Sequence, residues 1–354
     1  MQPLVSYILK NLNWRSALLV LVINLGITLA IWLCIEMFFG AFIERRGSSL
    51  AQIQFAIMTS REFTVADSDR GFRLRKNFSS STIHTNSQGF RGKEIPKVLT
   101  NQRLVLALGE STTFGWGVGD DESYPSQLER ILNSTSANKP FVVVNAGIPS
   151  YSSRQVFLYA DQLLTRLQPD VVIVSILWND LFYSSIEEWK PQSLVPPYPS
   201  GLQQILFKYS HVYRWSTSKS ARPELVNFYS KDAVTEYQKN IESILTLCKS
   251  KGIPVIFVEP PFSAHLIPKA GLTIWETRLS EKFVPEIADL FLAAQLQELE
   301  SRQVPFVRHL LGISKRPTPE YFSDFLHTNV EGNRIIAQRI ADFLHDDNLL
   351  AERK

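Results

Sequence analysis

The chain has 354 residues, of which 45% are hydrophobic and 20% charged, so a packed core is expected and wholesale disorder is excluded. Its formal net charge is +3, and no basic stripe with interleaved aromatic residues points to nucleic acid as a partner. Cys34 and Cys248 lie far apart in sequence, and no cysteine–histidine cluster has zinc-ligand spacing. We therefore expect neither a disulfide framework nor a metal ion, and no motif calls for a cofactor.

The first predicted element is an apolar helix near the N-terminus. Residues 16–35 are uncharged and mostly leucine, valine, isoleucine, alanine and tryptophan. About 20 such residues are long enough to cross the hydrocarbon core of a bilayer as a helix. Glu36 falls near the far end, where its carboxyl group can reach the interface. Arg45 and Arg46 end the apolar stretch, so residues 1–45 are predicted to be a tail and a single transmembrane anchor.

Two other interpretations of this segment carry less weight. A buried helix of a soluble domain would normally have a polar face. A signal peptide has a shorter apolar core, and no clean small-residue cleavage site follows this one. The lysine and arginine counts on the two sides are close, so the positive-inside rule decides little. We expect a cytoplasmic N-terminus and a catalytic domain on the extracytoplasmic side of the membrane.

Residues 46–100 are predicted to be a polar connector with a β-hairpin that packs on the edge of the main domain. The turn-forming stretch Thr85–Gly89 supports the hairpin. From about residue 101, apolar strands alternate with helices. We expect strands at 103–108, 140–145, 170–176, 254–258 and 304–309, and helices at 124–132, 152–167, 234–251, 285–302 and 330–344. This pattern predicts an α/β fold over residues 101–354, a three-layer α/β/α sandwich with a mostly parallel sheet.

An insertion rich in proline and aromatic residues interrupts this alternation at residues 186–231. Insertions of this length between core elements are usually functional or disordered. The aromatic residues favour an ordered lid or a wall of the substrate site. The alternative is an insertion that only packs against the side of the domain.

Four polar clusters lie just after predicted strands or before a predicted helix. They are Gly109–Gly115, Asn145–Ser152, Trp178–Asp180 and Asp324–His327. Since the carboxyl ends of parallel strands share one edge of the sheet, the first three clusters can converge there. Ser111 in the first cluster needs a base and a carboxylate that orients the base, and the fourth cluster supplies both residue types.

Three of these clusters also have a structural interpretation. Ser111 could cap a helix, Asn179 and Asp180 could form a turn, and Asp324 could mark a helix entry. A phosphate-binding loop is a further alternative for residues 109–119. It fails because no Gly-Lys-Ser/Thr follows and because the glycine spacing does not match the dinucleotide fingerprint.

The order of these clusters resembles that of the SGNH hydrolases, the GDSL-type serine esterases, over about residues 101–345. Gly109-Glu-Ser111 is similar to the Gly-Asp-Ser block of the family, with Glu110 in place of aspartate. Leu177-Trp-Asn-Asp180 is similar to its Gly-x-Asn-Asp block, with leucine in place of glycine. Asp324-Phe-Leu-His327 matches its Asp-x-x-His block. The resemblance implies a flavodoxin-like fold and an ester hydrolase.

The resemblance also implies roles for individual residues. Ser111 would be the nucleophile, His327 the general base and Asp324 the residue that orients it. The oxyanion hole would consist of the backbone N–H groups of Ser111 and Ser150 and the side-chain amide of Asn179. Ser150 stands where the family has a glycine, and the local glycine lies three residues earlier.

The most direct function is therefore a membrane-tethered serine esterase that cleaves acyl esters of a carbohydrate or a lipid without a cofactor. One alternative is an O-acyltransferase that uses the same triad on a glycan acceptor. Another is a non-catalytic, anchored glycan-binding or assembly protein on a degenerate hydrolase scaffold. The departures at Glu110, Ser150 and Leu177 motivate this last alternative, and the intact Ser111, Asp324 and His327 argue against it. The oligomeric state is not predicted.

Overall fold

The computed structural model describes residues 14–45, 63–96, 101–135, 139–185, 189–191, 202, 205–206, 210–213, 227–269, 272–274, 277–315 and 317–346. The chain divides into two compact units. One unit contains residues 1–52 together with residues 199–221, and the other contains residues 53–198 and 222–354. Most of the predicted insertion at 186–231 lies outside the described residues.

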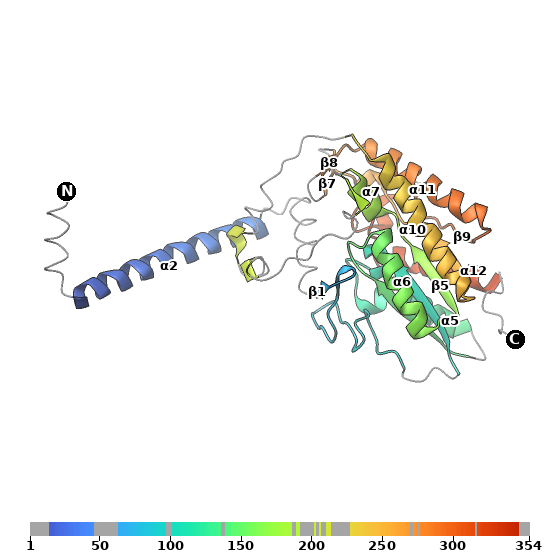
Figure 1. The fold of residues 1–354 in the computed structure, drawn as a ribbon, viewed down its shortest axis with the longest axis horizontal. Helices are drawn as coiled ribbons and strands as arrows, with labels where there is room; N and C mark the ends of the chain where they lie inside the picture. Colours follow the sequence, from blue (N-terminus) through green and yellow to red (C-terminus); the bar gives the residue numbers. More distant parts are fainter. Residues whose placement is uncertain are drawn as a thin grey trace. The chain divides into compact units, whose positions relative to one another are not determined.

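A five-stranded parallel sheet forms the centre of the larger unit (Figure 1). Its strand order is β4-β3-β5-β6-β9, and each neighbouring pair is parallel. The strands are β3 (Arg103–Gly109), β4 (Phe141–Gly147), β5 (Val171–Ser175), β6 (Val255–Val258) and β9 (Phe306–Val307). Their apolar runs are buried almost throughout, as expected of a parallel sheet covered on both faces.

Helices cover both faces of this sheet. Along β5, Val172 and Val174 belong to the core on the side of α6 (Ser153–Leu167), α7 (Trp178–Ser184), α10 (Lys231–Ser250) and α11 (Phe283–Ser301). Val171 and Ile173 belong to the core on the side of α5 (Tyr124–Thr135) and α12 (Val330–Asp346). Side chains alternate between the faces because a strand has a period of two. The predicted three-layer α/β fold is confirmed.

The segment at residues 63–96 packs against the same core as the sheet. It contains an antiparallel hairpin of β1 (Thr64–Asp67) and β2 (Gly71–Leu74). Phe63, Leu74 and Phe90 are buried in the core beneath α6. Further short elements, none predicted, are the hairpin of β7 (Leu272–Ile274) and β8 (Thr277–Leu279), the helix α4 (Ser111–Phe114), and 3-10 turns at Asp120–Glu122, Ala264–Leu266, Ile313–Lys315 and Pro319–Tyr321.

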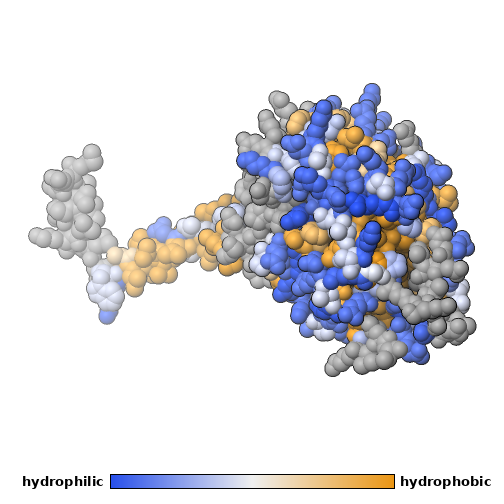
Figure 2. Space-filling model, turned by 45° about the vertical axis from the view of Figure 1, so that its right-hand side comes forward, coloured by the Kyte–Doolittle hydropathy of each residue, from blue (hydrophilic) through white to orange (hydrophobic). Residues whose placement is uncertain are grey.

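The smaller unit is dominated by one long helix, α2 (Trp14–Arg45). Its residues Trp14–Ala41 make a stretch of 28 residues that is long and apolar enough to cross a membrane. Large apolar side chains are exposed along most of its length, as Figure 2 shows. A signal sequence near the N-terminus would meet the same criteria of length and composition.

His309, which follows β9, is buried as a neutral imidazole. Its Nε2 lies 2.6 Å from the carbonyl oxygen of Glu259, and its Nδ1 accepts from the N–H of Leu311 at 3.2 Å. Nδ1 therefore has no proton, and a proton added there would point at the N–H of Leu311. Burial, aided by the charge of Arg339, lowers the pKa of His309 to about 4. His309 thus has a structural role.

We expect the free energy of unfolding to fall as the pH drops from about 6.5 to about 4. In this pH range His309 binds a proton in the unfolded chain but not in the folded one. The free energy of unfolding should therefore decrease by about 3 kcal/mol. Urea denaturation of the chain in detergent at several pH values measures the slope, which His309→Gln should flatten. The exposed His265 provides the control variant His265→Gln. Equal slopes for the wild type and His309→Gln would contradict this prediction.

Candidate active site

Ser111 lies at the turn between β3, an interior strand of the sheet, and the short helix α4. The turn is tight because Gly109 has no side chain. A Cβ atom at Gly109 would lie 2.2 Å from Oγ1 of Thr113 and 2.5 Å from the carbonyl oxygen of Ser175. Gly115 ends the helix with φ of 85°, a left-handed conformation that glycine adopts without strain. The side chain of Ser111 is therefore held at the carboxyl edge of the sheet.

The structure brings Ser111, His327 and Asp324 within hydrogen-bonding distance of one another. Oγ of Ser111 lies 2.8 Å from Nε2 of His327, and Nδ1 of His327 lies 2.6 Å from Oδ2 of Asp324. We assign the proton to Nδ1, since a carboxylate only accepts, which leaves Nε2 to accept from the serine hydroxyl. The three groups are half-buried and thus reachable from solvent.

Asp324 is held in place by the backbone as well as by His327. Its Oδ1 accepts from the N–H groups of Leu326, at 2.9 Å, and of His327, at 2.8 Å. Burial alone would raise the pKa of Asp324, but its electrostatic attraction to the imidazole of His327 and these hydrogen bonds more than offset burial and lower that pKa below its usual value. Asp324 is therefore an anion that can stabilise a positively charged imidazole.

The turn after β4 places Ser150 beside the nucleophile turn. The N–H of Ile148 donates to the carbonyl oxygen of Gly109 at 3.1 Å, and the N–H of Tyr151 donates back to Ile148 at 3.2 Å. Ser150 itself has φ of 67°, in the left-handed region that glycine prefers. Within the described part of the chain, the N–H groups of Ser150 and Ser111 have no hydrogen-bond acceptor. Both predicted backbone donors are thus at the same edge of the sheet and unoccupied by protein.

The side-chain amide of Asn179 is arranged differently from the prediction. Its Nδ2 donates to Oε2 of Glu110 and, at 2.9 Å, to the carbonyl oxygen of Tyr151. Both N–H bonds of the amide are therefore taken by protein acceptors. A role at the oxyanion requires one of them to be released, and it stays a prediction.

Glu110 links the nucleophile turn to the start of α7, a function that the sequence analysis missed. Its Oε1 accepts from the N–H groups of Leu177, at 2.9 Å, and Trp178, at 2.8 Å. Its Oε2 accepts from the N–H of Asn179 at 2.9 Å in addition to the side-chain amide. The residue is 1% exposed, and burial raises the pKa of its carboxyl group to about 8 against the opposing effect of these donors. The signal for this role was the glutamate itself, directly before the nucleophile.

Asp180 fastens α7 to α6. Its carboxyl oxygens accept from the N–H of Ser153 at 2.7 Å and from the hydroxyl of Ser153 at 2.5 Å. Nδ2 of Asn240 on α10 donates to the same hydroxyl at 3.0 Å. Asp180 is buried, and burial raises its pKa to about 7. It positions helices and does not reach the triad through any described contact.

Arg91, from the segment before the sheet, holds the loop that follows Ser111. Its Nη1 donates to the carbonyl oxygens of Phe114, at 2.7 Å, and Gly115, at 2.6 Å, and its Nη2 donates to that of Val118 at 2.6 Å. Its Nε pairs with Asp120 at 2.8 Å. Because the guanidinium group is buried and carries five donors, it can fix several carbonyl groups at once. No sequence motif indicated this role.

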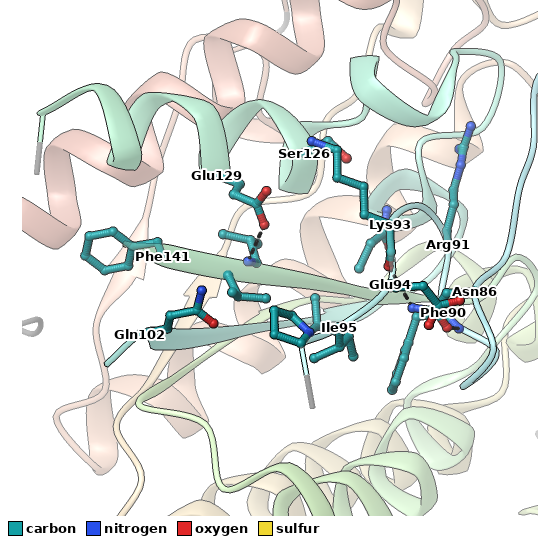
Figure 3. Close-up of a pocket in the computed structure, with 15 residues that line it drawn as sticks. Asn86, Phe90, Arg91, Lys93, Glu94, Ile95, Gln102, Ser126, Glu129 and Phe141 are labelled. Carbon is teal, nitrogen blue, oxygen red and sulfur yellow. Dashed lines mark hydrogen bonds between the residues drawn. The ribbon is translucent and has the colours of Figure 1, made fainter. Parts of the chain in front are cut away.

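A cavity of about 270 Å³ lies beside the edge strand β4 (Figure 3). Glu129 accepts from the N–H of Val143 there at 2.8 Å. Nearby, Asn133 exchanges two hydrogen bonds with Phe141 of the same strand. These side chains occupy the open edge of β4, which would otherwise be free to pair with another strand. The cavity contains no triad residue. Within the described ranges, no group of three histidine, cysteine or acidic residues is placed to hold a metal ion.

Comparison with known families gives one match that covers most of the larger unit. A model described as the GDSL-like lipase/acylhydrolase family matches residues 107–335. This span includes the nucleophile turn, the start of α7 and the Asp324–His327 cluster. No curated protein matches the chain.

Several solved structures are similar to part of this chain at low sequence identity. A GDSL-like lipase from Bacteroides thetaiotaomicron is 18% identical with a TM-score of 0.43, and the match covers 71% of this chain and 91% of that one. The psychrotrophic esterase EstA from Pseudoalteromonas sp. is 14% identical with a TM-score of 0.45, and coverage is 70% and 99%. An acetyl xylan esterase is 12% identical with a TM-score of 0.44, and coverage is 68% and 99%. At these scores the likeness says nothing about substrate.

Proposed function

Because the chain belongs to the GDSL-like lipase/acylhydrolase family, whose members cleave ester bonds, we propose that it hydrolyses acyl esters through a covalent intermediate on Ser111. The observation that carries this proposal is the distance of 2.8 Å between Oγ of Ser111 and Nε2 of His327. A serine hydroxyl is a weak nucleophile unless a base takes its proton, and this geometry allows the transfer.

The proposed reaction has two halves. In the first, Oγ of Ser111 attacks the ester carbonyl while its proton passes to Nε2 of His327. The tetrahedral intermediate then collapses, and the imidazolium gives that proton to the departing alcohol. In the second half, His327 takes a proton from water, the resulting hydroxide attacks the acyl-enzyme, and Ser111 is released with its proton restored. Asp324 stabilises the imidazolium in both halves.

The negative oxygen of each tetrahedral intermediate needs hydrogen-bond donors. The N–H groups of Ser111 and Ser150 support this role, since they lie at the same edge of the sheet and have no acceptor among the residues that the structure describes. Asn179 would join them if its amide turned away from Tyr151 or Glu110 when substrate binds. Each such donor is typically worth on the order of 10²–10³ in turnover.

We propose further that α2 tethers the hydrolase to a membrane and that the substrate is an acyl ester of a carbohydrate or a lipid. The exposed apolar length of Trp14–Ala41 supports the tether. The half-buried triad, with the ring of Trp116 centred 6.4 Å from that of His327, supports a substrate that approaches from solvent along an aromatic wall. We place the catalytic unit on the extracytoplasmic side.

Trapping with a fluorophosphonate probe tests the nucleophile. The probe should phosphonylate Ser111 of the full chain in detergent micelles, as read by mass spectrometry of the labelled peptide. Label on another residue would overturn the assignment of the site. Absence of both labelling and hydrolysis of p-nitrophenyl esters of any acyl length would instead favour the non-catalytic alternative.

The two fates of the acyl-enzyme can be separated in the same preparation. With an activated acetyl ester and an added sugar, a hydrolase releases acetate, whereas an O-acyltransferase yields a sugar heavier by one acetyl group. We expect acetate as the main product. Comparison of acetyl, butyryl and palmitoyl esters then distinguishes carbohydrate-type from lipid-type acyl groups.

A further inference from the structure

The smaller unit contains a contact between α2 and the insertion that the proposed function does not use. Glu36 is the only charged residue between Ser16 and Ile43. Its Oε1 accepts from the hydroxyl of Ser210 at 2.5 Å. Its Oε2 accepts from the N–H of His211 at 2.6 Å and, more weakly, from that of Val212 at 3.3 Å. The one carboxylate between Ser16 and Ile43 is therefore hydrogen-bonded to residues far away in sequence.

Helix α2 also packs closely against His211 at Gly40, one turn beyond Glu36. A Cβ atom at Gly40 would lie 3.1 Å from two atoms of the His211 ring, so the glycine allows the ring to approach the helix backbone closely. Gly40 is also buried, in contrast with the exposed side chains earlier in the helix. Residues 199–221 and α2 belong to one compact unit. The contact thus joins two segments by polar bonds and by close packing.

The position of Glu36 along the helix corresponds to the surface of a bilayer. The uncharged stretch of 20 residues before it spans about 30 Å at 1.5 Å per residue, which is about the thickness of the hydrocarbon core. A carboxylate at this depth is costly unless it has partners. Three donors from one segment supply them, so this segment must come to the same depth.

The composition of residues 199–221 also fits a membrane surface. Leu202 and Ile205 have 68% and 56% of their surface exposed, although both are large and apolar. In sequence, the segment also contains three aromatic residues that carry a hydroxyl or an indole N–H group, with two basic residues adjacent to them in the chain: Tyr209, Tyr213, Trp215, Lys208 and Arg214. Tyrosine, tryptophan and basic residues are enriched where protein meets the lipid headgroups.

We propose that Leu202, Ile205 and residues 210–213 lie in the interfacial layer of the membrane, where the two apolar side chains contact lipid directly, and that residues 210–212 are attached to α2 through Glu36. This inference rests on the proposed tether. The segment lies in the chain between α7, which carries part of the candidate site, and α10. The chain of the larger unit is therefore joined to membrane-associated residues at two places in its sequence, after α2 and at the insertion.

Depth-dependent quenching by brominated lipids tests the lipid contact. A cysteine at Ile205 in the full chain, in a Cys34→Ala background, is labelled with a nitrobenzoxadiazole dye after reconstitution into phosphatidylcholine–phosphatidylglycerol vesicles. Cys248 is buried and should not react. The matched control is a cysteine at Leu310, an apolar residue of the larger unit that is 69% exposed. We expect at least twofold stronger quenching at position 205 than at position 310.

The attachment through Glu36 is tested in the same vesicles. Glu36→Leu should lower the quenching at position 205 to that at position 310, because the segment loses its three hydrogen bonds. Asn24→Leu is the matched control, since the Asn24 side-chain amide donates to the carbonyl oxygen of Val20 within α2 and has no other partner among the described residues. This variant should leave the quenching unchanged.

The possible outcomes separate the two proposals. Extraction of the wild-type chain from vesicles by alkaline carbonate overturns the tether, and the interfacial contact with it. A chain that resists extraction but has a water-exposed dye at position 205 overturns only the interfacial contact. Strong quenching at position 205 that Glu36→Leu does not change overturns only the role of Glu36.

Discussion

Ser111→Ala should lower kcat for p-nitrophenyl acetate by about 10⁴-fold or more, because the variant has no group that can form the acyl-enzyme. The fold should be unaffected, since the only side-chain hydrogen bond of Ser111 in the described residues goes to His327. Initial rates of the full chain in detergent provide the measurement, and thermal denaturation followed by circular dichroism checks the fold. The exposed Ser314, whose backbone alone contacts Glu259, provides the control variant Ser314→Ala, which should keep full activity.

The same experiment can show whether the three residues act as one unit. His327→Ala should lose about as much activity as Ser111→Ala, and the double variant should be no worse than either, because a broken proton relay cannot be broken again. Losses that multiply in the double variant would mean that the two residues act independently. Full activity of Ser111→Ala would refute the proposed mechanism.

Glu110→Ala should destabilise the fold by at least about 3 kcal/mol. The substitution leaves three buried backbone N–H groups and the Asn179 amide without the acceptor that Glu110 provides, and each unsatisfied buried donor costs about 1–3 kcal/mol. A loss of this size is a large part of the stability of an ordinary domain. Urea denaturation of the chain in detergent, monitored by circular dichroism, measures it.

Two further variants make this prediction specific. Glu110→Gln keeps one acceptor oxygen and should lie between the wild type and Glu110→Ala, so it remains measurable if the alanine variant does not fold. Glu300→Ala, at an exposed position of α11, should change little. A loss below about 1 kcal/mol for Glu110→Ala would mean that water replaces the carboxylate and that the link to α7 is not important.

Local pattern was enough to predict the layers of the fold. Each strand of the central sheet is a short apolar run that must be buried on both faces, and each covering helix has apolar residues three and four apart, so the assignment needs only neighbouring residues. The short helices were missed because a pattern of neighbouring residues needs more than two turns to become visible. The helices α4 and α7 have 4 and 7 residues, too few for a helical period to appear.

The candidate nucleophile, base and orienting carboxylate could be named from sequence because their spacing relative to strands and helices is distinctive. The hydrogen bonds that hold the surrounding turns together could not be predicted from sequence. Glu110 and Asn179 are 69 residues apart, and they meet only because β3 and β5 are neighbours in the sheet. The sequence resemblance assigned Asn179 to the oxyanion, whereas the structure has its amide on Glu110 and Tyr151.

The same division between sequence and structure holds for helix α2. Sequence alone determined that an uncharged stretch of about 20 residues could span a bilayer, because that depends on length and composition only. Sequence also placed Glu36 near one end of this stretch, but it did not identify the groups that hydrogen-bond to Glu36. Only the tertiary structure decided that Ser210 and His211, 174 and 175 residues further along the chain, are those partners. The physical reason is that a hydrogen bond depends on which groups the folded chain brings within 3 Å, whereas hydrophobic length and periodicity are properties of consecutive residues.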